Sequence, residues 1–190
     1  ALQANTTASY NISIGEDSMD ANTTGASNVA VGHQALTANT TADNNTAVGY
    51  TALAANTTGA SNVAIGALAL DANTTANNNT AVGYSSLTAN TTGTRNTALG
   101  FEALLTNVTG VDCVAIGNRA LKLSTVNSNT AVGSNSLELT TSGATNTAVG
   151  SAALYANTTA SANTGMGYYA LGANTTGASN TAVGFQALDA

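Results

Sequence analysis

The sequence has very little charge, no proline and no tryptophan, and each absence excludes a class of protein. Charged residues make up 6% of the 190 residues, with three lysines and arginines against nine acids. A disordered tail would be rich in charge and proline, so the composition argues against one. Three cations cannot neutralise a row of phosphates, which makes nucleic acid and anionic membrane surfaces poor candidates as partners.

Cysteines and long apolar runs are also scarce. The single cysteine, Cys113, excludes an internal disulfide framework. No apolar run approaches the roughly 20 residues of a membrane-spanning helix, so we expect no membrane insertion. The chain has no initiator methionine and begins in the middle of a repeated phrase. We therefore expect residues 1–190 to be a single repetitive segment cut from a longer chain.

The chain consists of eleven copies of one sequence repeat. A glycine in the motif AVG, or a close variant, marks each copy, and successive marker glycines are 17 residues apart except for one step of 16. Such a period is typical of a solenoid, in which one unit stacks on copies of itself. The short step lies in an irregular region, residues 105–138, that we interpret as a defect in the rod. The marker glycines are Gly15, Gly32, Gly49, Gly66, Gly83, Gly100, Gly117, Gly133, Gly150, Gly167 and Gly184.

The residue pattern of each repeat predicts two short strands. The three residues before a marker glycine alternate, as in Val63-Ala64-Ile65, which indicates a strand. Four residues after the glycine stands leucine in every copy but one, where Met19 replaces it, and the surrounding ALxA segment also predicts a strand. The glycine and the NTTG segment supply the corners. The sequence therefore predicts an all-β fold, a parallel β-solenoid or β-roll of about eleven 17-residue coils, spaced about 4.8 Å apart.

The small residues of the repeat lead to a prediction about self-association. If the valine and leucine rows face the interior, the alanine in the middle of each strand faces outward. The alanine or serine three residues after each glycine then faces outward too, as at Ala35, Ala52, Ser86 and Ala103. A solvent-facing position has no reason to stay small through eleven copies, whereas a position against another backbone has. We therefore expect a contact face of alanine and serine that meets sister chains.

Two rows of asparagine recur at fixed places and predict hydrogen-bonded amide ladders along the axis. One row precedes the strand, from Asn11 onward, and Cys113 fills its one gap as a substitution within the ladder rather than as a nucleophile. The other row lies in the NTT turn, where the same asparagines form N-glycosylation sequons. We assign Asn22, Asn39, Asn56, Asn73, Asn90, Asn157 and Asn174 to the ladder, with glycosylation of Asn22, Asn39, Asn56, Asn73 and Asn90 as the alternative.

A stripe of aromatic residues directly follows the marker glycines. It consists of Tyr50, Tyr84, Phe101, Tyr168 and Phe185, with His33 in the same row. Such a stripe could bind sugars, cover a seam between chains or cap a corner of the rod. We favour the seam or the corner.

Catalytic chemistry is not expected. The acids are spread over different coils, and nothing in the sequence would activate the plentiful hydroxyl side chains as nucleophiles. Glu16, Asp17 and Asp20 cluster in one coil, but a solvated corner explains them better than a cation site. We predict that the chain is not an enzyme and that it uses no cofactor and no metal.

The repeat NTAVGxxALxANTTG resembles the SVAIGxxAxAxG head repeat of YadA-type trimeric autotransporter adhesins. Val63-Ala64-Ile65-Gly66 and Val114-Ala115-Ile116-Gly117 match it most closely. It is also similar to the NTAVGYxAL repeats of phage tail fibres and related bacterial fibre proteins. The resemblance covers the whole chain and implies a homotrimeric, left-handed parallel β-roll that serves adhesion or displays a receptor-binding tip. The coil here is longer than that of the adhesins in its NTTG turn.

These observations favour a structural fibre or adhesin shaft whose partner is itself, placed outside the cell, on a cell surface or on a virion. A cell-surface receptor or glycan would be bound through a tip that is not in this sequence. One alternative is an ice- or surface-binding solenoid that uses ranks of threonine and asparagine. Another is a filament subunit that stacks end to end through its open coil edges.

Overall fold

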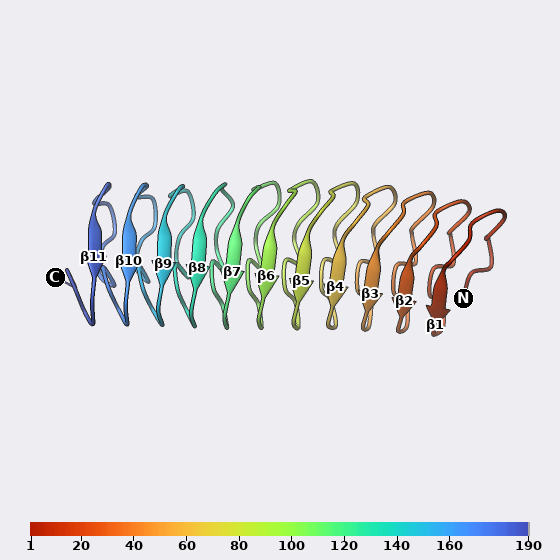
Figure 1. Cartoon of the computed structure of the whole chain (residues 1–190), viewed down its shortest axis with the longest axis horizontal. Helices are drawn as coiled ribbons and strands as arrows, with labels where there is room; N and C mark the ends of the chain where they lie inside the picture. Colours follow the sequence, from red (N-terminus) through yellow and green to blue (C-terminus); the bar gives the residue numbers. More distant parts are fainter. Residues whose placement is uncertain (190) are drawn as a thin grey trace.

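The structure, a computed structural model, describes residues 1–189 and forms a rod of stacked coils (Figure 1). Each coil contributes one three-residue strand to a single parallel sheet, in which the eleven strands follow one another in chain order. The predicted parallel β-solenoid of 17-residue coils is confirmed. Residues 1–189 form no helix, and hence none long and apolar enough to cross a membrane. The strands are β1 (Ile12–Ile14), β2 (Val29–Val31), β3 (Thr46–Val48), β4 (Val63–Ile65), β5 (Thr80–Val82), β6 (Thr97–Leu99), β7 (Val114–Ile116), β8 (Thr130–Val132), β9 (Thr147–Val149), β10 (Thr164–Met166) and β11 (Thr181–Val183).

Neighbouring strands pair in register, so that each residue lies opposite its counterpart in the next coil. Thr46 of β3 pairs with Val63 of β4, and the backbone N–H of Thr46 donates to the carbonyl oxygen of Asn62 at 2.8 Å. β7 and β8 keep this register across the 16-residue step, with Val114 opposite Thr130. The backbone hydrogen bonds of each coil are therefore made largely with the coils before and after it.

The coil with the 16-residue step loses its residue from the NTT turn. In other coils the carbonyl oxygen of the glycine or alanine after NTT accepts a hydrogen bond from the asparagine that precedes the strand, as Gly110 does from Asn96. In the short coil Val126 accepts the corresponding bond, from Cys113. Ser124 stands at the asparagine position of this turn, and Val126 follows it by two residues, whereas the accepting residue follows by three in the other coils. The second threonine of the turn is therefore the missing residue, and Figure 1 shows β7 and β8 side by side like the other strands.

The prediction of a second strand in each coil is wrong. The segment after each marker glycine is a chain of turns, in which the backbone N–H of Ala35 donates to the carbonyl oxygen of Gly32 at 3.3 Å. Two residues of this segment, Gln34 and Leu36, have a φ of 54°. Residues with a positive φ direct their side chains differently from residues in extended backbone. The alternation of inward and outward side chains in ALxA therefore arises from turns and not from a strand.

The predicted directions of the strand side chains are also wrong. In β3 the central Ala47 is fully buried, whereas Thr46 and Val48 are only half-buried and face outward. The alanine and serine residues expected to meet sister chains lie inside the coil as well. Ala35, Ala52, Ser86 and Ala103 are all fully buried, so they form no contact face.

The reason for this arrangement is the narrow interior of the coil. The leucine of the turn segment points inward in every coil from Leu36 to Leu154, and each of these side chains is fully buried. The centre of the facing strand then has room for a methyl group and little more. Gly165 occupies one such position, and a Cβ built on it would lie 3.2 Å from Cγ of Leu154. One leucine layer with small residues opposite it therefore makes the core.

The marker glycines allow the coils to stack closely. Each has a φ between +126° and +140°, a region that is essentially restricted to glycine. A Cβ at Gly133 would lie 2.5 Å from the carbonyl oxygen of Gly150 in the next coil. Glycine is therefore needed here both for the backbone conformation and for the space between coils.

Replacing Gly133 with alanine tests this requirement. We expect Gly133→Ala to lower the free energy of unfolding by about 3 kcal/mol or more, because strain and overlap with the next coil add together. Urea denaturation followed by circular dichroism measures the change. The adjacent Ser134 is exposed, so Ser134→Ala should change stability by less than about 0.5 kcal/mol. Equal losses in the two variants would contradict the explanation.

Candidate functional site

The outer side of the β-sheet is a continuous uncharged surface, here called the sheet face. It is formed by the first and third residues of strands β1 to β11, and every one of them is valine, isoleucine, leucine, methionine or threonine. Ile65, Leu99 and Met166 remain 40–44% exposed. The first position is threonine in seven of the eleven strands and the third is apolar in all of them, so the sheet face is a mixed hydroxyl and apolar surface and a candidate contact surface.

The asparagines of the NTT turn form a row of amide hydrogen bonds inside the rod, here called the turn ladder. Nδ2 of Asn39 donates to Oδ1 of Asn22 at 2.8 Å and to the carbonyl oxygen of Ala42 at 3.1 Å. The same bond to the preceding amide recurs at Asn56, Asn73 and Asn90, and Asn174 donates to Asn157 at 3.1 Å. The ladder is interrupted in two coils, where Ser124 and Thr140 replace asparagine, and Oγ of Ser124 is buried without a hydrogen-bond partner.

The asparagines that precede each strand form a second buried row, here called the strand ladder. Oδ1 of Asn28 accepts a bond of 2.9 Å from the backbone N–H of Asn45, and Nδ2 of Asn45 donates to the carbonyl oxygen of Gly59 at 2.8 Å. Each amide therefore satisfies a backbone donor in one coil and a backbone acceptor elsewhere in the turn. Buried polar groups without such partners would cost stability, which explains the recurrence of asparagine at this position.

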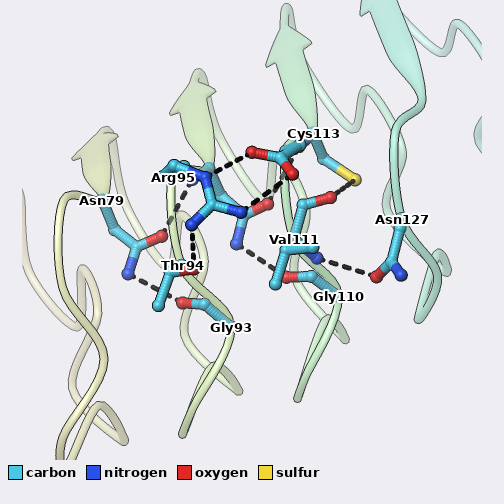
Figure 2. A network of polar contacts seen from close by, with 10 residues as sticks. Asn79, Gly93, Thr94, Arg95, Gly110, Val111, Cys113 and Asn127 are labelled. Atoms are coloured by element: carbon cyan, nitrogen blue, oxygen red, sulfur yellow. Dashed lines mark hydrogen bonds and ion pairs between the residues drawn. The ribbon is translucent and has the colours of Figure 1, made fainter.

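Cys113 occupies one position of the strand ladder (Figure 2). Its backbone N–H donates to Oδ1 of Asn96 at 3.0 Å, and its Sγ lies 3.1 Å from the carbonyl oxygen of Val126, where an asparagine would place its amide donor. The side chain is fully buried, and burial raises the pKa of the thiol. A thiol in this state is a poor nucleophile, so Cys113 acts as part of the ladder.

Burial of the turn ladder bears on the glycosylation alternative. Nδ2 of Asn56 donates to Oδ1 of Asn39 and to the carbonyl oxygen of Gly59, and the side chain has no exposed surface. A glycan on this atom would replace one of its two hydrogens, and therefore remove at least one of these bonds, and it has no room inside the coil. Modification of Asn22, Asn39, Asn56, Asn73 or Asn90 would therefore have to precede folding, and it would prevent the ladder from forming at that coil.

The aromatic row lies on the corner of the rod directly after the marker glycines, next to the sheet face. Its side chains are well exposed, from 41% at Phe101 to 73% at Phe185. Rings in adjacent coils stack nearly parallel at distances that favour aromatic pairs. The stacked pairs are His33 with Tyr50, Tyr84 with Phe101, and Tyr168 with Phe185, with ring centroids 5.4, 5.6 and 5.3 Å apart.

All three cations of the chain form ion pairs with acids of a neighbouring coil, close to the 16-residue step. The Arg95 guanidinium donates two hydrogen bonds to the Asp112 carboxylate, at 2.6 and 3.0 Å (Figure 2). Nζ of Lys122 lies 2.8 Å and Nε of Arg119 3.2 Å from Oε2 of Glu102. Lys122, and more weakly Arg119, hold the pKa of Glu102 below its ordinary value, and Arg95 lowers the pKa of Asp112.

The remaining acids do not come together as a reaction site. Within residues 1–189 no three potential metal ligands among His, Cys, Asp and Glu form a group. Glu16 is exposed and lies 3.9 Å from Nε2 of His33. Asp20 and Asp71 each bury one carboxylate oxygen without a hydrogen-bond partner, and burial raises the pKa of Asp71. Asp20 and Asp71 lie in different coils, and the carboxylate–imidazole contact of Glu16 with His33 is exposed to solvent.

The threonine hydroxyls of the NTT turn bond along the rod. Oγ1 of Thr23 donates to the carbonyl oxygen of Thr40 at 3.0 Å, and Oγ1 of Thr40 donates to that of Thr57 at 3.2 Å. The second threonine of the turn, such as Thr24, is exposed, and both lie in a bend rather than in a strand. The turn therefore presents one exposed rank of threonine to solvent.

Comparison with known proteins identifies no relative. No protein-family model, no curated protein and no solved structure matches the chain. The function is therefore argued below from the surfaces of the rod.

Two of these features, the sheet face and the ion pairs between coils, were not predicted from the sequence. The sheet face was assigned to the interior, although the complete lack of charge in two parallel rows is itself a signal of an outer contact surface. The ion pairs also had a signal in the sequence, because Arg95 precedes Asp112 and Glu102 precedes Arg119 by one repeat of 17 residues. Opposite charges one repeat apart lie side by side in a solenoid.

The strand ladder can be tested at Asn62, whose side chain bonds the backbone N–H of Asn79 and the carbonyl oxygen of Ala76. Asn62→Ala should lower the free energy of unfolding by about 1–3 kcal/mol, because it leaves the backbone N–H of Asn79 buried without this partner. The carbonyl oxygen of Ala76 keeps its bond from Nδ2 of Asn73. Asn118 is exposed, so Asn118→Ala is the matched control and should be nearly neutral. Urea denaturation compares the two, and a neutral Asn62→Ala would contradict the structural role of the ladder.

The pKa shifts of two acids predict opposite effects of pH. Because the pKa of Glu102 is lowered in the folded chain, its stabilising effect is present above about pH 4.3 and is lost as pH falls through the lowered pKa. Glu102→Gln should therefore lower the thermal midpoint at pH 7 and match the parent chain in strong acid.

Asp71 provides the companion measurement, since its pKa is raised. Its ionisation destabilises the fold as pH rises through the raised pKa, so Asp71→Asn should increase the midpoint at pH 7. Thermal unfolding between pH 3 and 7 records both variants. A Glu102→Gln deficit that persists unchanged at pH 3, or an Asp71→Asn variant less stable than the parent at pH 7, would contradict these assignments.

Proposed function

We propose that the chain is a structural shaft of an extracellular fibre or adhesin, located on a cell surface or a virion, that associates with copies of itself through the sheet face and performs no catalysis. The single observation that carries this proposal is the sheet face, which stays free of charge through eleven coils. The acids and cations of the chain all lie outside it. A surface kept free of charge along the whole rod is explained by contact along the whole rod.

Copies of the chain suit this surface because the rows repeat at one spacing. Two rods lying side by side bring equivalent rows together in every coil, so that valine, isoleucine and threonine pack against the same residue types. Burying such rows gains free energy in proportion to the apolar area removed from water. The net charge of −6 is carried by other faces of the rod, where it opposes non-specific clumping.

The number of chains and the hand of the coil follow from the resemblance to trimeric adhesins and phage fibres, which supports a left-handed homotrimer. In such an assembly the two amide ladders stiffen each rod from within, and the sheet faces join the rods. The mechanical result is a spacer that holds a receptor- or glycan-binding tip away from its base. Its length grows by about 4.8 Å with each coil.

A second candidate is binding to ice or another ordered surface. The observation that favours it is the regularity of the sheet face, in which the first position of the strand is threonine in seven of the eleven strands and the third is apolar. A flat array of hydroxyl and methyl groups at one spacing could order water. Thermal hysteresis of a solution of the chain distinguishes this candidate, because a fibre shaft should show none.

The mass in solution tests the leading proposal. We expect sedimentation equilibrium to give three times the mass of one chain, and the double variant Val82→Lys, Val132→Lys, with two charges on the sheet face, to give the mass of one chain. Thr92→Lys with Ser134→Lys adds the same charge at exposed turn positions and should leave the trimer intact. Circular dichroism verifies that each variant keeps its β-structure.

Two outcomes would contradict the proposal. A parent chain that sediments as a single copy has no use for its sheet face in self-association. A mass that rises without limit with concentration, and that the sheet-face variant does not reduce, indicates end-to-end stacking of coils instead.

A further inference from the structure

The aromatic row contains one gap that is a single coil wide. Tyr50, Ala67 and Tyr84 occupy the same position in three successive coils, so the two tyrosines stand on either side of an alanine. Both tyrosines are about half exposed, at 56% and 50%. Within residues 1–189 this is the one place where a single small side chain separates two aromatic residues of the row.

The spacing of the gap matches one ring. Where aromatic residues occupy adjacent coils, their centroids lie 5.3–5.6 Å apart, so the rod stacks one ring per coil. Tyr50 and Tyr84 are two coils apart, which corresponds to about 9.6 Å along the axis. Two stacking steps therefore fit between them, and the methyl group of Ala67 leaves the middle place of the stack open.

The walls of the gap are held in place before any ligand arrives. Tyr50 stacks on His33 with an interplanar angle of 9°, and Tyr84 stacks on Phe101 with an angle of 12°. Each tyrosine thus has one ring face covered by its partner in the adjoining coil, and the other turned toward Ala67. Fixed walls reduce the ordering cost of binding.

We propose that this gap binds one pyranose ring of a neutral sugar, held between the faces of Tyr50 and Tyr84 above Ala67. A pyranose with all its hydroxyls equatorial has apolar C–H groups on both faces and hydroxyls around its edge. The two tyrosines offer an aromatic face on each side and a phenol hydroxyl at each outer edge.

The surroundings favour a neutral sugar over other ring-shaped ligands. The nearest cation along the chain is Arg95, which is bonded to Asp112, so no cation is placed to attract an anionic ligand. A purely aromatic ligand would offer no hydroxyl partners to the two phenol groups, whereas the edge of a sugar does. The wider interval between Phe101 and Tyr168 is filled by Asn118, Ser134 and Ser151, and it spans too many coils for one ring to touch both sides. The inference adds a binding site to the shaft and stands whether or not the chain is a trimer.

Cellotriose is a suitable probe because its glucose units are all equatorial. Saturation-transfer NMR and tyrosine ring shifts of the full 190-residue chain should report weak binding, with a dissociation constant on the order of 1 mM. Ala67→Tyr should fill the gap with a protein ring, leave the circular dichroism unchanged, and weaken binding by about tenfold or more. Tyr84→Ala should have the same effect on binding, whereas Tyr168→Ala, which alters a stacked pair away from the gap, should leave it unchanged.

Four results would overturn the proposal. These are no saturation transfer at millimolar cellotriose, binding that Ala67→Tyr does not weaken, and tighter binding of N-acetyltyrosinamide than of cellotriose. The fourth is a change in the solution mass of Ala67→Tyr, which would assign the gap to a seam between chains. A parent chain that is monomeric and still binds cellotriose would contradict the shaft proposal while leaving the sugar site supported.

Discussion

Stacking of coils at one fixed step is the constraint on which every other feature of the rod depends. The marker glycines bring successive backbones so close that even a methyl group would overlap the next coil. At that distance the backbone groups of adjacent coils bond directly, and each side chain meets its own counterpart. The amide bonds of the turn ladder, the stacked rings of the aromatic row and the ion pair of Arg95 with Asp112 then join residues one repeat apart. The sequence repeats because a residue suited to a position must also suit the copy of itself beside it.

Features that depend only on this repetition could be predicted from the sequence. The 17-residue period required a solenoid, the recurring asparagines required amide partners along the axis, and the leucine row was correctly placed in the interior. Cys113 could be placed in the strand ladder because it stands where the repeat has asparagine. These inferences use spacing along the chain, which a stacked structure converts directly into neighbours in space.

Features that depend on the cross-section of the coil could not be predicted in the same way. Alternation in a strand shows that two sets of residues face opposite sides, but it does not say which side is inside. Val48 beside Ala47 would ordinarily be taken as core, and only the leucines packed across the narrow interior exclude it. The segment around Leu36 alternates through left-handed backbone conformations, which are rare for leucine and which no propensity scale suggests.

The stretch around the 16-residue step combines several weaknesses of the rod. Cys113, Ser124 and Thr140 replace asparagine in the two ladders within neighbouring coils, and one hydroxyl there is buried without a partner. The Arg95–Asp112 ion pair in this region is about half exposed, and pairs of that kind contribute little to stability. The pair of Lys122 with Glu102 is less accessible to water, with side chains 22% and 19% exposed. The sheet nevertheless remains in register, because backbone pairing does not depend on which side chain fills a ladder.

A rod in which each coil touches only its two neighbours has no preferred length. Removing or adding one complete phrase of 17 residues recreates the same junction between identical surfaces, and nothing elsewhere in the molecule detects the change. Insertion or removal of a whole phrase changes the length of the rod and leaves the contacts of the other coils in place. The same architecture that makes the rod regular therefore lets its length change in increments of one coil without redesign of the rest.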